Sequence, residues 1–130
     1  MTLQFSIITP DRIFLNDEAE EIILPTNTGQ MGVLKGHAPL ITALDIGVFL
    51  YRSQKKWTPL ALMGGFALIL RDNITLLVNE AESSSTIDLA VSKADLASAR
   101  QQYLQATNPK QKVSANFALK RAQARYQVVQ

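Results

Sequence analysis

Few side chains in this 130-residue sequence could take part in covalent or metal chemistry. The sequence has no cysteine and a single histidine, His37, which excludes disulfides, cysteine nucleophiles and most metal sites. A catalytic role for His37 would need an orienting carboxylate and a nearby nucleophile, and the sequence locates neither. We therefore interpret His37 as a turn residue that bonds the backbone or contacts a partner.

Two further clusters have ordinary structural interpretations. Glu18, Glu20 and Glu21 could mimic a general acid and base pair, but alternation along a strand explains them as a solvated edge that opposes aggregation. Gly29–Gly32 is not a phosphate loop, because the sequence contains neither G-x-x-x-x-G-K-[ST] nor G-x-G-x-x-G. The segment is typical of a turn that needs positive φ, with an exposed Met31 beside it as a contact residue.

A group of basic residues near the C-terminus has three interpretations. Lys112, Lys120, Arg121 and Arg125 are spaced to lie on one side of a helix. They could be solvated surface, a nucleic-acid patch or a docking site for an acidic protein. No aromatic residues are interleaved with them and no nucleic-acid motif is present, so RNA or DNA binding is the least favoured.

The elements that must position these residues fall into two parts that divide near residue 86. Residues 1–86 contain six basic and nine acidic residues, a net charge of −3, whereas residues 87–130 contain seven and two, a net charge of +5. All six glycines and four of the five prolines precede residue 87. We therefore predict one domain over residues 1–86 and a differently built one over residues 87–130.

The first part is typical of short strands separated by turns. Residues 3–7 alternate apolar and polar side chains until Pro10, and a β-branched run at 21–24 ends at Pro25. No helix of three turns is predicted between the strands, so an antiparallel sandwich or flattened barrel is favoured over a parallel α/β sheet. Further strands are predicted at 32–34, 40–44, 47–52, 57–63, 66–70 and 74–78.

The second part has the periodicity of two helices. From Leu89 to Ala106 apolar residues recur at spacings of three, four and seven, with 92–95 as a capping-box variant at the start. Pro109 ends this helix, and a second helix begins near Lys110. Small alanines on both helices allow their backbones to approach closely, so we predict an antiparallel helical hairpin.

No segment has the length of a membrane-spanning helix. The longest uncharged stretch, 57–70, has 14 residues and contains Pro59, whereas a span needs about 20 apolar residues. The first residues lack the features of a secretory signal or a transit peptide. We expect the chain to act where it is made, either soluble or held at a membrane by partners.

Six segments, taken in their order and spacing, form a pattern that covers nearly the whole chain. They are 21–34, 37–39, 45–47, 61–67, 78–82 and 115–122. Together they resemble the epsilon subunit family of the F-type ATP synthase, the small rotor subunit of the central stalk. The form Ala-Leu-Met-Gly-Gly-Phe-Ala at 61–67 is closest to chloroplast and cyanobacterial members.

This resemblance implies a β-sandwich of about ten antiparallel strands followed by a C-terminal antiparallel α-helical hairpin. It also implies a non-catalytic rotor subunit that couples c-ring rotation to the gamma subunit, with a hairpin that inhibits ATP hydrolysis through the catalytic beta subunit. The implied location is the stromal side of the chloroplast thylakoid membrane, or a cyanobacterial thylakoid. Position by position, the resemblance assigns c-ring contact to Gly29, Gln30, Met31 and Gly32, gamma contact to Thr9, His37 and Thr42, and inhibition to Lys120, Arg121 and Arg125.

The sequence departs from the family pattern at three positions. Gln30 stands where many bacterial relatives have Glu, and Lys35 replaces a frequent Pro. Some bacterial relatives bind ATP through an Ile/Leu-Asp-x-x-Arg-Ala motif, but Val91 stands at the arginine position here, so no cofactor is expected. The alternatives are a small sandwich enzyme or carbohydrate binder that uses the acidic strand, and a basic RNA-binding module.

Overall fold

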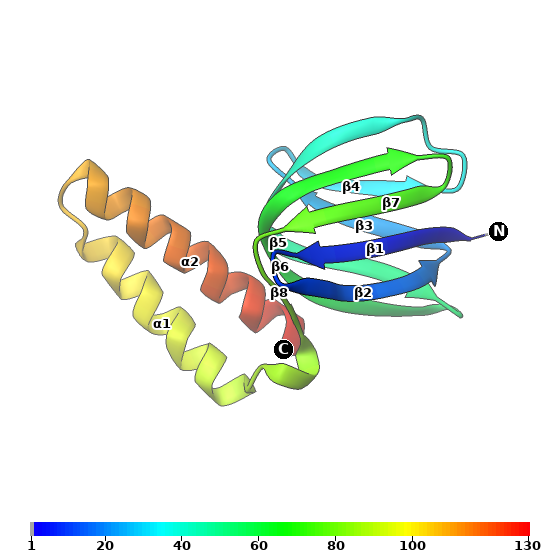
Figure 1. Ribbon diagram of the computed structural model, residues 1–130. Helices are drawn as coiled ribbons and strands as arrows, with labels where there is room; N and C mark the ends of the chain where they lie inside the picture. The colour runs from blue at the N-terminus through cyan, green and yellow to red at the C-terminus, as the bar shows by residue number, and fades with distance from the viewer. Residues whose placement is uncertain (1) are drawn as a thin grey trace.

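The computed structural model describes residues 2–130, and it confirms the predicted sandwich with a C-terminal helical hairpin (Figure 1). The eight strands are β1 (Leu3–Thr9), β2 (Arg12–Ala19), β3 (Glu21–Thr26), β4 (Gly29–Leu34), β5 (Leu40–Ser53), β6 (Lys56–Leu70), β7 (Asn73–Val78) and β8 (Ala81–Ser83). A 3-10 turn (Ser84–Thr86) leads to helices α1 (Leu89–Gln105) and α2 (Pro109–Val129). Two details differ from expectation: there are eight strands instead of about ten, and β1 pairs with β7 in parallel.

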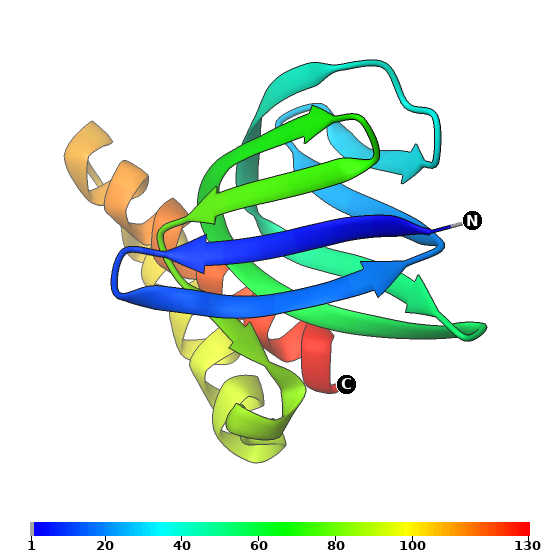
Figure 2. The same cartoon turned by 45° about the vertical axis from the view of Figure 1, so that its right-hand side comes forward.

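One continuous sheet folds over itself and supplies both layers of the sandwich. Its order is β2-β1-β7-β6-β5-β3-β4, and β8 pairs with β6 outside this path. Residues 65–70 of β6 pair with β7, whereas residues 60–62 pair with β8. The two long strands β5 and β6 therefore pass from one layer to the other (Figure 2).

The sheet turns its corner at a gap in the pairing between β5 and β6, whose register is the same on both sides of the gap. Asp45 and Gly64 have no partner in the described register of this pair. Gly64 and Gly65 have φ of 81° and 148°, and a Cβ on Gly65 would overlap the carbonyl oxygen of Leu77, so only glycine fits there. The strands predicted separately at 40–44 and 47–52, and at 57–63 and 66–70, are each one long strand through this corner.

The core between the layers is closed by apolar side chains of the strands alone. Phe5 packs at its centre, with its ring 5.5 Å from Phe49 and 4.9 Å from Tyr51. The sixteen buried residues of this core all lie between Leu3 and Val78. Within the described residues, the helices therefore contribute nothing to the interior of the sandwich.

Each helix begins at a side chain that caps its first turn. Asp88 accepts a hydrogen bond of 2.9 Å from the N–H of Val91, and Asn108 accepts one of 2.8 Å from Gln111. The predicted capping box at 92–95 is wrong, because α1 begins earlier and Ser92 is buried within it. Neither helix within residues 2–130 is long and apolar enough to cross a membrane.

The hairpin packs on the sandwich through one half of α2. Ala124 and Val128 pack against Ala61 and Met63 on the outer face of β6, while the two helices meet through Leu96, Ala99 and Ala122. The other half of α2 and the turn between the helices project beyond the sandwich (Figure 1). Only the C-terminal half of α2 is thus held by apolar contacts to the strands.

Candidate functional site

His37 lies half-buried in the loop between β4 and β5. Its Nδ1 donates to the carbonyl oxygen of Ala38 over 2.7 Å. Asp72 holds the same loop, because its Oδ1 accepts a hydrogen bond of 2.7 Å from the N–H of Gly36. Within residues 2–130, no group of three or more histidine, cysteine or acidic side chains could hold a metal ion. The geometry is that of a structural or contact residue.

Arg52 accounts for two members of the acidic cluster. Its guanidinium lies 2.9 Å from Glu20 and 3.4 Å from Glu21. Glu18 is exposed on β2, an edge strand of the sheet. The prediction of a solvated edge is confirmed for Glu18. Glu20, just before β3, and Glu21, its first residue, instead form ion pairs with Arg52 near the end of β5.

The hairpin between β3 and β4 carries the residues assigned to c-ring contact. Gly29 has φ of 119°, as predicted for this turn, and Gln30 beside it is exposed. Gly32 does not need positive φ, because it lies in extended strand β4, and a Cβ there would make only an ordinary contact of 3.9 Å with Glu21 Oε2. Met31 is half-buried and packs on the sandwich core, so the prediction of an exposed methionine is only partly met.

A row of apolar side chains, which we call the apolar row, crosses strands β2, β1, β7, β6 and β5. The sequence analysis did not identify it. The pairing register places Ile13, Ile8, Leu77, Phe66 and Ala43 side by side on five neighbouring strands. Ile13 and Phe66 are both 59% exposed and Leu77 is 54% exposed. The uninterrupted apolar run at 66–70 is the signal that could have revealed the row, because a strand with one solvated face alternates instead.

The three residues assigned to gamma contact differ in their relation to this apolar row. Thr9 follows Ile8 at the end of β1, and its hydroxyl donates to Asp11 over 2.7 Å, which lowers the pKa of that carboxyl. Thr42 precedes Ala43 in β5 and is half-buried. His37 lies at the opposite end of the layer, because its loop is bonded to Asp72, whose carbonyl oxygen accepts from Gln4 at the start of β1.

Three basic residues in the C-terminal half of α2 face carboxylates of the sandwich, whereas Lys112 is exposed. We call Lys120, Arg121 and Arg125 the basic face, and Asp45, Glu80 and Glu82 the acidic strip. Lys120 Nζ lies 3.0 Å from Asp45, Arg121 Nη2 lies 2.8 Å from Glu80, and Arg125 Nε lies 2.8 Å from Glu82.

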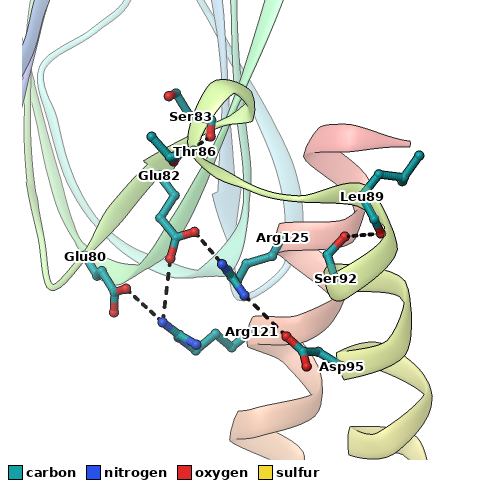
Figure 3. A network of polar contacts seen from close by, with 9 residues as sticks. All are labelled: Glu80, Glu82, Ser83, Thr86, Leu89, Ser92, Asp95, Arg121 and Arg125. Atoms are coloured by element: carbon teal, nitrogen blue, oxygen red, sulfur yellow. Dashed lines mark hydrogen bonds and ion pairs between the residues drawn. The ribbon is translucent and has the colours of Figure 1, made fainter.

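Two further contacts join these ion pairs into a network. Arg121 also lies 3.6 Å from Glu82, and Arg125 reaches Asp95 of α1 over 3.7 Å. Figure 3 shows Arg121 and Arg125 between Glu80 and Glu82 on one side and Asp95 on the other. Sequence reasoning could not find the pairs of Lys120, Arg121 and Arg125 with the acidic strip, because the closest hydrogen-bonded partners are 41 residues apart along the chain.

Known proteins match this chain over both of its parts, the strands and the helices. Residues 2–84 match the family described as ATP synthase, Delta/Epsilon chain, beta-sandwich domain. The chain is 64% identical to the chloroplastic ATP synthase epsilon chain of Oltmannsiellopsis viridis, over 99% of this chain and 98% of that one. It is 61% identical to the corresponding chain of Chlorella vulgaris, over 99% and 96% of the two chains.

Two solved structures share the fold at low sequence identity. One is a chain in the mitochondrial ATP synthase of Euglena gracilis, with a TM-score of 0.83 and 23% identity over 95% of this chain and 78% of that one. The other is a chain in the central stalk and c-ring structure of the mitochondrial ATP synthase of Tetrahymena thermophila, with a TM-score of 0.68 and 13% identity over 100% and 98%. At these identities the likeness concerns the fold alone.

Proposed function

This chain belongs to the epsilon chains of the ATP synthase delta/epsilon family, and from that membership we propose that it couples rotation of the c-ring to the gamma subunit. It is a non-catalytic subunit of the ATP synthase, and the enzymatic and RNA-binding alternatives are not favoured. Relatives named as chloroplastic indicate the chloroplast. We propose the stromal side of the thylakoid membrane as its place there.

The observation that carries the proposal is the apolar row. The sandwich already has a closed core, so the exposed side chains of this row have no structural role within residues 2–130. Five strands about 4.8 Å apart make a row roughly 19 Å wide, which accommodates a helix about 10 Å in diameter. We assign the row to the gamma subunit, with Thr9 and Thr42 beside it, and we propose a separate gamma contact for His37 at the opposite end of the layer.

The β3–β4 hairpin is our proposed contact with the c-ring. Gly29 and Gln30 are exposed directly after the turn at 27–28 that forms its tip, and Thr26 fixes the tip because its hydroxyl donates to the carbonyl oxygen of Gly29 over 2.9 Å. Gln30 offers an amide in place of a carboxylate, so the contact we propose is a hydrogen-bonding one. Met31 supports the tip from the core side instead of forming its surface.

Replacing Gly29 by Val is expected to uncouple proton flow from ATP synthesis. A φ of 119° is disfavoured for a β-branched residue by roughly 1 to 3 kcal/mol, so the backbone should shift and displace Gln30. Proton-driven ATP synthesis in reconstituted membranes should fall about twofold or more. The exposed Leu34 at the far end of β4, replaced by Val, is the matched control, and unchanged synthesis with Gly29→Val would refute this contact.

The basic face is our proposed inhibitory element, directed at an acidic segment of the catalytic beta subunit. Exposed ion pairs each contribute about 0 to 1 kcal/mol, so no single residue should dominate. Three together could bias a conformational equilibrium whose states differ by a few kcal/mol. The net charge of +5 on residues 87–130 supports attraction to an acidic partner.

Replacing Lys120, Arg121 and Arg125 together by Ala should weaken inhibition of ATP hydrolysis about tenfold at low salt. Inhibition by the unmodified chain should also fall as ionic strength rises, because the Debye length is about 10 Å at 0.1 M salt. The measurement is ATP hydrolysis by the soluble catalytic complex at low and high salt. Lys112→Ala, which removes an exposed charge elsewhere on α2, is the control. Equal inhibition by the triple variant and the unmodified chain at low salt would contradict the charge mechanism.

A further inference from the structure

The sheet has two free edges, and their sequences differ. β2 and β4 stand at the two ends of the strand order, so each has a hydrogen-bonded strand on one side only. β2 carries charged side chains at Arg12, Asp17 and Glu18, and a bulge at Phe14 interrupts its pairing with β1. Charges and bulges are the usual means by which proteins stop an edge strand from pairing with another chain. The β2 edge is therefore protected against strand addition.

The β4 edge has none of these features. Gly29–Leu34 contains no charged residue and no proline. Its pairing with β3 runs without a bulge, from Gly29 opposite Thr26 to Leu34 opposite Glu21. An uncharged, regular edge strand is a template for pairing with another backbone. We therefore expect this edge to be covered when the chain is assembled with its partners.

Three residues of β4 present main-chain groups on the free edge. The two-residue turn at 27–28 makes Thr26 and Gly29 a hydrogen-bonded pair. Hydrogen-bonded and non-hydrogen-bonded pairs then alternate along an antiparallel ladder, so every second residue of β4 directs its N–H and carbonyl away from β3. These residues are Gln30, Gly32 and Leu34, and all three are exposed.

Two observations agree with this alternation. Pro25 lies opposite Gln30, at a position where the N–H of β3 would point toward β5, and the pairing of β3 with β5 stops two residues earlier, at Ile23. At the other end of β4, the carbonyl oxygen of Leu34 accepts a hydrogen bond of 3.2 Å from the N–H of His37. The other five outward groups, three N–H groups and two carbonyls, have no main-chain partner within residues 2–130.

Gly32, at the middle of the free edge, has no explanation within the chain. Its φ is not in the left-handed region, and an added Cβ would make only an ordinary contact. Glycine weakens a strand, and inside one it often marks a site where another backbone approaches closely. The residue type thus agrees with the unprotected edge in indicating a partner that contacts the main chain.

We propose that the c-ring pairs with β4 through main-chain hydrogen bonds, as an extended, uncharged segment added at the free edge. This inference rests on the proposed c-ring contact of the β3–β4 hairpin and extends it from Gln30 to Gly32 and Leu34. The free edge continues that contact without a break, which favours the c-ring as the occupant. Outward residues of a strand are about 6.8 Å apart, so three of them span about 14 Å and can pair with about five residues of an extended loop.

Hydrogen exchange in the assembled ATP synthase tests the pairing amide by amide. The N–H groups of Gln30, Gly32 and Leu34 should exchange at least about tenfold more slowly in the complete enzyme than in the complex with gamma alone. The N–H groups of Met31 and Val33 already bond to β3, so they are the internal control and should change little. Unchanged exchange at Gly32 and Leu34 would overturn the inference, and so would slow exchange that is already present without the c-ring.

Two variants at position 32 test the same pairing by activity. Gly32→Pro removes the central outward N–H but no hydrogen bond to β3, and proline is tolerated at such edge positions. It should lower proton-driven ATP synthesis about three- to tenfold, the range expected when one hydrogen bond is lost. Gly32→Ala keeps the N–H and is the matched control. Gamma binding should be unchanged in both, which shows that the sandwich is folded. Equal synthesis by the two variants would contradict main-chain pairing.

A cross-link separates the mode of contact from the contact itself. The sequence has no cysteine, so Gln30→Cys can carry a photoreactive group at an exposed position. Capture of the c subunit in the assembled enzyme is the expected result. Capture combined with unchanged hydrogen exchange at Gly32 would leave the proposed c-ring contact standing and overturn only the main-chain pairing. Absence of capture would overturn the contact and this inference with it.

Discussion

Replacing Phe66 by Asp should weaken binding to the gamma subunit about 100-fold, which corresponds to about 2.7 kcal/mol. Phe66 is at an inner position of the apolar row, between Leu77 and Ala43, and it is the row's only aromatic side chain. The substitution removes a large apolar contact and places a carboxylate where a partner would exclude water. Titration of labelled gamma subunit with the purified chain measures the change in dissociation constant.

The control for this variant needs a similar exposure on a different surface. Leu89 is 50% exposed, compared with 59% for Phe66, and it lies in the first turn of α1, where an acidic side chain is well tolerated. Leu89→Asp should leave gamma binding within about twofold of the unmodified chain, the range expected of a surface substitution. If Phe66→Asp also stays within that range while remaining folded, the apolar row is not the gamma surface.

The fold was predictable because its local signals agree with its tertiary structure. Alternation at residues 3–7 located β1, and Pro109 located the break between the helices. Pro25 was wrongly predicted to end a strand, because β3 continues through it to Thr26. The corner at Asp45 and Gly64 was not predictable, because a glycine pair inside an apolar run is also compatible with a turn between two strands. That ambiguity is why β5 and β6 were each predicted as two separate strands.

The same contrast between local signals and long-range structure applies to the candidate sites. His37 and Gly29 could be placed in turns from residue type alone, because a short-range rule governs them. The apolar row is built from one residue of each of five strands, so it exists only once the register is known. The pairing of the basic face likewise depends on where α2 docks, which no helical period specifies. Surfaces assembled across distant segments were therefore the part that sequence reasoning missed.

Truncation after residue 86 should abolish inhibition of ATP hydrolysis while gamma binding and proton-coupled synthesis survive. The buried core of the sandwich ends at Val78, and every residue of the apolar row belongs to a strand. Removing residues 87–130 takes away the whole basic face but no strand. The proposed domains at 1–86 and 87–130 would then act separately, the first in assembly and the second in regulation.

The truncated chain needs one adjustment, because the hairpin covers apolar side chains of the sandwich. Val48 and Met63 on the outer face of β5 and β6 lose their cover when α2 is removed. Val48→Thr and Met63→Gln keep β-compatible side chains there and reduce the exposed apolar patch. Hydrolysis by the soluble catalytic complex should then equal that measured without any added chain. A folded truncated chain that fails to bind gamma would show that the hairpin takes part in assembly, and one that still inhibits would show that inhibition originates in the sandwich.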